Sequence, residues 1–139
     1  MAEQDSPHIQ IVSPPPKLLP LLEKLKTAYK LWFEHYTDLP KAHRYTLGSR
    51  IDGLLIDCVE AISVASFTSR ADKLPHVRFA IRKLDTAKIL LLVLWETKSL
   101  DNKKYIALSE KIEEVGRMLG GWHGQLTKQS SPEQNPRER

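Results

Sequence analysis

The sequence predicts an all-α protein that folds as an antiparallel, up-down-up-down four-helix bundle. Four segments carry apolar residues at alternating spacings of three and four, which is typical of the buried face of a helix in a bundle. Short breaks separate the segments, and short connections favour antiparallel neighbours. No segment shows a sustained alternation of apolar and polar residues, so no sheet is expected.

The apolar stripes and the breaks between them place the helices in order. The stripes extend over residues 18–36, 47–65, 77–94 and 105–122. Pro40 ends the first helix because its ring disfavours helical geometry at Leu39. The break at 69–72 ends the second helix and offers Asp72 as an N-cap, and the break at 99–101 again contains capping residues.

The domain organisation follows from the same pattern. Residues 17–128 are expected to form one bundle domain. Residues 1–16, which end in three prolines, are expected to be a flexible arm, and residues 129–139 a disordered tail, because neither shows apolar periodicity.

Composition excludes several classes of protein. The single cysteine, Cys58, rules out an intramolecular disulfide and fits a reducing compartment, so we expect a cytoplasmic protein. The longest apolar run, 89–95, is far shorter than a membrane span, and MAEQDSPHIQ does not resemble a signal peptide. No membrane partner is therefore expected. The net charge of +4 is a weak indication of an anionic partner.

Catalytic and metal-binding patterns are not found in the sequence. There is no HxxxH or HExxH pairing, no Glu-x-x-His pair and no Gly-rich phosphate loop. Cys58 lies on an apolar stripe and is expected to be a buried, unreactive thiol. The histidines after His8 are expected near helix ends, in solvent. The sequence thus predicts a protein that is not an enzyme and holds no metal or cofactor.

Basic residues gather on the third helix and at the start of the second. Residues 72–98 contain six basic and three acidic residues, and Arg78 and Arg82 share one face because they are four apart. Arginine suits phosphate or carboxylate recognition. An ordinary solvated face with local pairs such as Arg82–Asp85 is the equally weighted alternative. The candidate nucleic-acid-binding or protein-binding residues are Arg78, Arg82, Lys83, Lys88, Arg44 and Arg50.

Glycines are unusually frequent in the fourth helix. Gly116, Gly120 and Gly124 are four apart and form one stripe on the helix that carries Trp122. Such a stripe allows close approach of another helix or subunit, with Trp122 supplying apolar surface. Gly48 is assigned the same packing role in the second helix. The alternative is that the fourth helix frays at 120–121. Close packing and fraying are both correct if Gly116 packs closely while Gly124 ends the helix.

Three stretches resemble a known family, the accessory variability determinant (Avd) proteins of diversity-generating retroelements. They are EEVGRMLGGW (113–122), RYTLGSRI (44–51) and VRFAIRKLDTAKIL (77–90), within a resemblance that covers about residues 17–128. The residues that match the family's motifs are Arg78, Arg82, Arg44, Gly48, Gly116, Arg117, Gly120 and Trp122.

The resemblance implies a homopentameric barrel of four-helix bundles. It also implies association with the element's reverse transcriptase and with nucleic acid, so that template RNA is copied with adenine-directed errors. A sister group of bundles, encoded in intervening sequences of ribosomal RNA genes, carries an Asn-Ile-Ala-Glu-Gly-like stretch in helix two. CVEAISVAS (58–66) departs from that stretch, which favours the retroelement family. The alternative is an interaction or structural bundle of the sister type without a reverse transcriptase partner.

Overall fold

The computed structural model describes residues 18–130, and every regular element in this range is helical. The elements are α1 (Leu18–Thr37), α2 (Lys41–His43), the π-helical turn η2 (Arg44–Gly48), α3 (Ser49–Ser66), the 3-10 turn η3 (Arg70–Asp72), α4 (Lys73–Glu96) and α5 (Asn102–Ser130). The expected arm at 1–16 lies outside the described residues, as does the expected tail except for its first two residues, which belong to α5.

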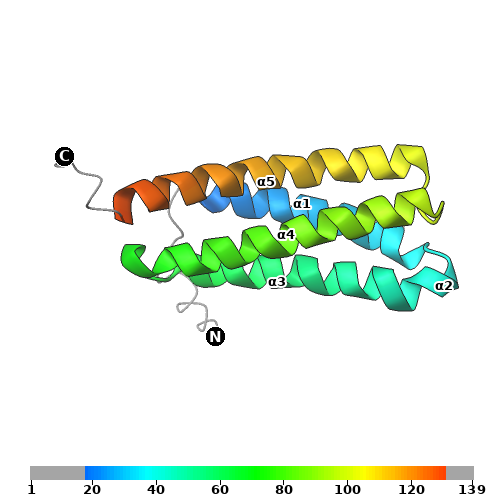
Figure 1. The fold of residues 1–139 in the computed structure, drawn as a ribbon, viewed down its shortest axis with the longest axis horizontal. Coiled ribbons are helices and arrows are strands. Elements are labelled where there is room, and N and C mark those ends of the chain that lie inside the picture. The colour runs from blue at the N-terminus through cyan, green and yellow to red at the C-terminus, as the bar shows by residue number, and fades with distance from the viewer. Residues whose placement is uncertain (1–17, 131–139) are drawn as a thin grey trace, which may run out of the picture.

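The four long helices form the expected antiparallel bundle (Figure 1). Each runs opposite to the one before it along the same long axis. α3 packs against α4, α4 against α5, α5 against α1 and α1 against α3, so the helices enclose one common core. The edge formed by α1 and α3 is therefore opposite the edge formed by α4 and α5.

The second helix differs from the regular helix that the apolar stripe predicts. Pro40 ends α1 as expected, but η2 interrupts the helical stretch between His43 and Ser49. Gly48 is buried in this turn, where an added Cβ would lie 2.8 Å from Leu39 Cδ1 and 3.0 Å from Tyr36 Cε1. Glycine thus lets the backbone of the π-helical turn pack directly on the end of α1.

The capping residues behave differently at the two remaining breaks. Asp101 caps α5, because its Oδ1 accepts a hydrogen bond of 2.9 Å from the backbone N–H of Lys104. Asp72 stands at the N-cap of α4 but makes no capping bond; its Oδ2 accepts a hydrogen bond from the Ser69 hydroxyl at 3.0 Å. Asp72 is thus the N-cap residue of α4, as expected, but its side chain does not cap the helix.

The buried faces of α4 and α5 agree with the predicted stripes, whereas that of α1 is rotated. Every predicted stripe residue of α4 is buried. On α1 the core is formed by Leu21, Leu25, Ala28 and Trp32, while Leu22 and Tyr29 are only half-buried. Leu25 and Trp32 belong to the predicted stripe and are buried as expected. In the core the Trp32 Nε1 donates a 3.1 Å hydrogen bond to Asp52 Oδ1.

Two histidines are less solvated than expected. His35 Nε2 is buried without a hydrogen-bond partner in the described residues, and burial, assisted by the charge of Lys104, lowers the pKa of His35. His43 Nδ1 lies 2.6 Å from the hydroxyl of Ser99, which joins the start of the second helical stretch to the α4–α5 connection. Both rings are part of the packing at this end of the bundle.

Cys58 is buried in the core, as predicted, and its burial has a consequence for stability at high pH. Its thiol donates a hydrogen bond of 3.3 Å to the carbonyl of Ala80. Burial, followed by the nearby charge of Asp57, raises the pKa of the Cys58 thiol from 9.0 to about 12. Above pH 9 the unfolded chain loses this proton while the folded chain retains it, so the free energy of unfolding falls as the pH rises.

We expect this linkage to lower the free energy of unfolding by about 1.4 kcal/mol per pH unit between pH 9 and 12. Urea denaturation at pH 8, 9 and 10, compared between the wild type and Cys58→Ala, measures the contribution. Tyr29, whose pKa rises from 10.0 to about 12, is present in both proteins and cancels in the comparison. A difference in unfolding free energy that stays constant from pH 8 to 10 would contradict the assignment.

Candidate functional site

Arg78 and Arg82 lie on the outer face of α4 and are both exposed. Neither makes an ion pair with a carboxylate among the described residues. The Arg82 guanidinium lies 5.9 Å from the centre of the Phe79 ring, an exposed aromatic on the same helix. The two guanidinium groups are therefore free to contact an external anion, and Phe79 offers a flat apolar surface beside them.

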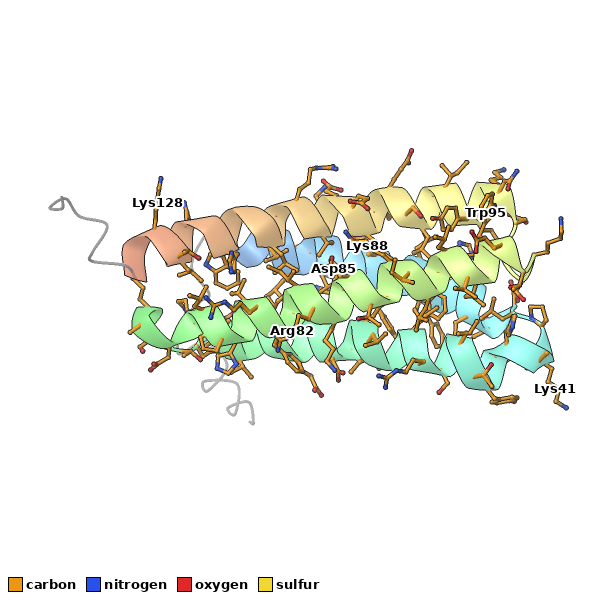
Figure 2. The ribbon with its side chains drawn as sticks, viewed as in Figure 1. Lys41, Arg82, Asp85, Lys88, Trp95 and Lys128 are labelled. Carbon is orange, nitrogen blue, oxygen red and sulfur yellow. The ribbon has the colours of Figure 1, made fainter. Side chains whose placement is uncertain are left out.

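Lys83 and Lys88 are on the same helix but already have partners. Lys83 Nζ lies 3.6 Å from Asp57 Oδ2 on α3. Lys88 Nζ lies 3.5 Å from Asp85 Oδ1 and 3.5 Å from Glu113 Oε2 on α5. Figure 2 shows Lys88 and Asp85 at the edge of α4 that faces α5, whereas Arg82 lies at the opposite edge. These half-buried lysines join α4 to α3 and to α5. Because their charges are partly neutralised by these carboxylates, they attract an external anion less strongly than an unpaired lysine would.

The local pair Arg82–Asp85, considered from the sequence, is not among the ion pairs of the described residues. Asp85 pairs with Lys88 instead, at 3.5 Å. Arg82 consequently keeps its charge unpaired, which favours a binding role over a neutralised surface.

The basic residues at the start of the second helical stretch divide into one structural and one exposed arginine. Arg44 donates from Nε and Nη2 to the carbonyl of Leu39, at 3.3 and 2.9 Å, and its guanidinium lies 5.9 Å from the ring centre of Tyr45. These bonds hold the α1–α2 connection in place. Arg50 is exposed on the first turn of α3. Of these two arginines, Arg50 is therefore the better placed to contact an external anion.

The glycines of α5 behave differently from the close-packed stripe predicted. The helix continues through all of them to Ser130, so it does not fray at 120–121 and Gly124 does not end it. Gly116 faces α4, where an added Cβ would make ordinary contacts of 3.5 Å with Lys88 Nζ and 3.7 Å with Leu84 Cδ2. A Cβ added at Gly120 would meet no side chain or other helix within 4 Å, so Gly120 makes no close approach inside the bundle. Contact of Gly120 with another subunit stays a prediction.

Trp122 contributes to the bundle itself. It is half-buried and packs against the hydrophobic core of the same chain. Most of its apolar surface therefore contacts the core of its own chain. The glycine at which another helix comes close is Gly48, and not a glycine of the α5 stripe.

Two aromatic residues beside the arginines were missed by the sequence analysis. Phe79 and Tyr45 are 37% and 67% exposed, and each lies under an arginine guanidinium. The signal was an aromatic residue off the apolar stripe and next to, or three residues before, an arginine. Because Arg44 is already bonded to the Leu39 carbonyl, the Arg82–Phe79 pair is the better candidate for charge beside a stacking surface, the combination that single-stranded nucleic acids bind.

Within residues 18–130 no cluster of three or more His, Cys, Asp or Glu side chains is placed to hold a metal ion. No helix in this range is long and apolar enough to cross a membrane.

Comparison with known proteins identifies the family. Neither the curated proteins nor the solved structures give a match. A family model described as bAvd-like matches residues 20–126, which include all three stretches that resemble Avd proteins and both arginines on the outer face of α4. Membership of this family indicates an accessory role in diversity-generating retroelements. Because the match covers most of the sequence and the fold is the four-helix bundle that the resemblance implies, the chain belongs to the bAvd-like family.

Proposed function

We propose that this protein is a non-catalytic accessory subunit of a diversity-generating retroelement that binds the element's reverse transcriptase and its template RNA or cDNA. In this role it supports mutagenic retrohoming as a homopentamer in the cytoplasm. The family match supports the accessory role, and the observation that carries nucleic-acid binding is the pair of unpaired arginines, Arg78 and Arg82, on the outer face of α4.

The electrostatics of the surface favour Arg78 and Arg82 over the other basic candidates. Lys83 forms an ion pair with Asp57, and Lys88 forms ion pairs with Asp85 and Glu113. Arg44 donates a hydrogen bond to a backbone carbonyl. Arg78 and Arg82 need break no internal ion pair before they contact a phosphate. Their planar groups, one helical turn apart, suit successive phosphates of a strand.

Repetition of this pair in an oligomer would turn weak contacts into useful affinity. One subunit offers few free charges, so a single copy binds weakly. A ring repeats the pair around its circumference and raises the effective concentration of binding groups without new contacts. Binding should be largely independent of sequence and strongly dependent on salt, because each neutralised phosphate releases counterions.

The double variant Arg78→Ala/Arg82→Ala tests this proposal. We expect RNA affinity to fall and the slope of log affinity against log salt to flatten by about 1.4 for two phosphate contacts to a single strand per subunit. Fluorescence anisotropy with a single-stranded RNA between 50 and 200 mM salt measures both quantities. The far-UV circular dichroism spectrum should not change, since both side chains are exposed.

A charge-matched control is Lys103→Ala/Lys128→Ala, which removes two positive charges from exposed positions on α5. It should leave the slope near the wild-type value. If both double variants change RNA binding equally, only net charge matters. If Arg78→Ala/Arg82→Ala leaves RNA binding intact but abolishes co-purification with the reverse transcriptase, the arginines are a protein-docking site. If neither activity changes, the outer face of α4 is a solvated surface.

A further inference from the structure

Phe79 is an aromatic residue of α4 that the core of the bundle does not use. It is 37% exposed and is not among the partly buried residues that pack against the core cluster. An exposed phenylalanine ring gives the fold little of the stabilisation that burial would provide. Part of the ring is therefore open to a ligand outside the bundle.

Two cations lie against the Phe79 ring. The guanidinium carbon of Arg82 is 5.9 Å and Lys83 Nζ is 4.9 Å from the ring centre. Lys83 Nζ is also 3.6 Å from Asp57 Oδ2, and this ion pair directs the lysine toward α3. Phe79 thus lies on the side of α4 that faces away from α5, as Arg82 does (Figure 2). The two contacts restrict the ring, so it loses less conformational freedom when a ligand binds to it.

The side chains nearest the ring are basic. Residues 73–84, the first half of α4, contain four basic residues and no acidic residue. The carboxylate of Asp57 on α3 pairs with Lys83, and that of Asp85, on the next turn of α4, pairs with Lys88 at 3.5 Å. An anionic ligand is therefore attracted to the half of α4 that carries the exposed ring.

We propose that Phe79 stacks on an unpaired base of a strand whose phosphates are bound by Arg78 and Arg82. The outer face of α4 then takes single-stranded nucleic acid in preference to a duplex. The inference rests on the nucleic-acid binding of the proposed function and adds the form of nucleic acid that the same site selects.

The chemistry of a nucleic-acid strand fits this arrangement. Arg78 and Arg82 are about 6 Å apart along the helix axis, and Phe79 lies beside them on the side toward α3. When phosphates of a single strand occupy the arginines, its unstacked bases are free to turn toward the ring. In a duplex the faces of the bases are covered by their neighbours, so the ring has no flat partner. Every base has an aromatic face, so the stacking adds affinity without sequence preference.

An abasic strand tests the stacking, because it keeps the phosphates and lacks the bases. Fluorescence anisotropy compares it with an oligothymidylate of the same length. The wild type should bind the oligothymidylate at least about 5-fold more tightly, the lower end of the contribution of one stacked base. Phe79→Ala should bind both strands with the affinity that the wild type has for the abasic strand. The slope of log affinity against log salt should not change, since no charge is removed.

Two conservative variants and one control separate stacking from other effects. Phe79→Tyr keeps an aromatic ring and should keep the preference for the strand with bases. Phe79→Leu keeps apolar volume without a ring and should lose it. Phe33→Ala removes a phenylalanine that is 50% exposed on α1 and stacks on Tyr29, with no cation–ring contact among the described residues, and should behave as the wild type. Far-UV circular dichroism should be the same for all variants, because neither ring belongs to the core cluster.

A duplex of the same length measures the selectivity. Its affinity should be equal for the wild type and Phe79→Ala, so the ratio of single-strand to duplex affinity should fall in the variant. Equal losses of single-strand and duplex affinity would overturn the proposal, because the ring would then only position the arginines.

The same probes distinguish this inference from the proposed function. If the wild type binds the abasic strand and the oligothymidylate equally, while Arg78→Ala/Arg82→Ala weakens both, nucleic-acid binding stands and stacking by Phe79 is wrong. If neither the arginine variant nor Phe79→Ala changes the affinity for any strand, both proposals are wrong.

Discussion

Replacement of Trp32 by alanine is expected to destabilise the protein by about 3 to 5 kcal/mol, a large share of the stability of a small domain. Trp32 is 0% exposed and is the largest of the fully buried side chains. Its removal leaves a cavity in the core beside α1, ends the ring stack with Tyr36 at 5.3 Å and deprives Asp52 of a hydrogen-bond donor. Urea denaturation followed by far-UV circular dichroism measures the loss.

Two further variants isolate the cause of this loss. Trp32→Phe keeps most of the ring volume, and Asp52 retains its 2.7 Å hydrogen bond from Tyr29, so the cost should be clearly smaller. Trp95→Ala removes the same side chain from a position that is 37% exposed, where a smaller loss is expected because less apolar area leaves water there. Equal losses for Trp32→Ala and Trp95→Ala would show that burial does not set the cost. All variants are compared at one protein concentration, because the stability of a protein that self-associates depends on concentration.

Gly48→Leu is expected to have the next largest effect, a destabilisation of roughly 1 to 3 kcal/mol by overpacking. Even an added Cβ would approach Leu39 Cδ1 to 2.8 Å and the Tyr36 ring to 3.0 Å. Leu39 is 1% exposed, so it has little room to move aside. Gly48→Ala should have the same sign and a smaller size, and chemical denaturation measures both.

The same type of substitution should have the opposite sign at two exposed glycines. A Cβ added at Gly53 or Gly120 would meet no side chain or other helix within 4 Å. Alanine at either position should stabilise the chain by roughly 0.5 to 1 kcal/mol, because glycine is the poorer helix former. If Gly48→Ala also stabilises, the close packing of η2 on α1 is wrong. If Gly120→Ala lowers the assembled fraction without lowering helical stability, its predicted contact with a second subunit gains support.

Local patterns in the sequence were sufficient for the helical framework. The apolar residues of α4 recur at spacings that only one face of a helix accommodates, and all of them are buried. Pro40 ends α1 because the effect of a proline on the preceding residue needs no tertiary contact. The sequence also places Arg78 and Arg82 on one face, since residues four apart in a helix always share a face.

Packing between helices decided what local patterns could not. On α1, Leu21 and Leu22 are adjacent apolar residues, and the rotation of the helix in the bundle determines which of them is buried. Likewise Gly48 and Gly120 are the same residue type in helical stretches, but only Gly48 faces another helix closely. Rotation and register depend on all the side chains that meet in the core, and a periodicity along one segment does not contain them.

For the candidate site, too, some features were determined by the sequence and others only by the tertiary structure. The sequence determined which basic residues are present, where they stand on their helices and, through three short motifs, which family the chain belongs to. Only the tertiary structure decided that Lys83 and Lys88 are paired, whereas Arg78 and Arg82 make no ion pair within residues 18–130. Asp57 and Glu113 come from other helices, and charges pair strongly only at a few ångströms, a separation that exists only once the bundle has packed.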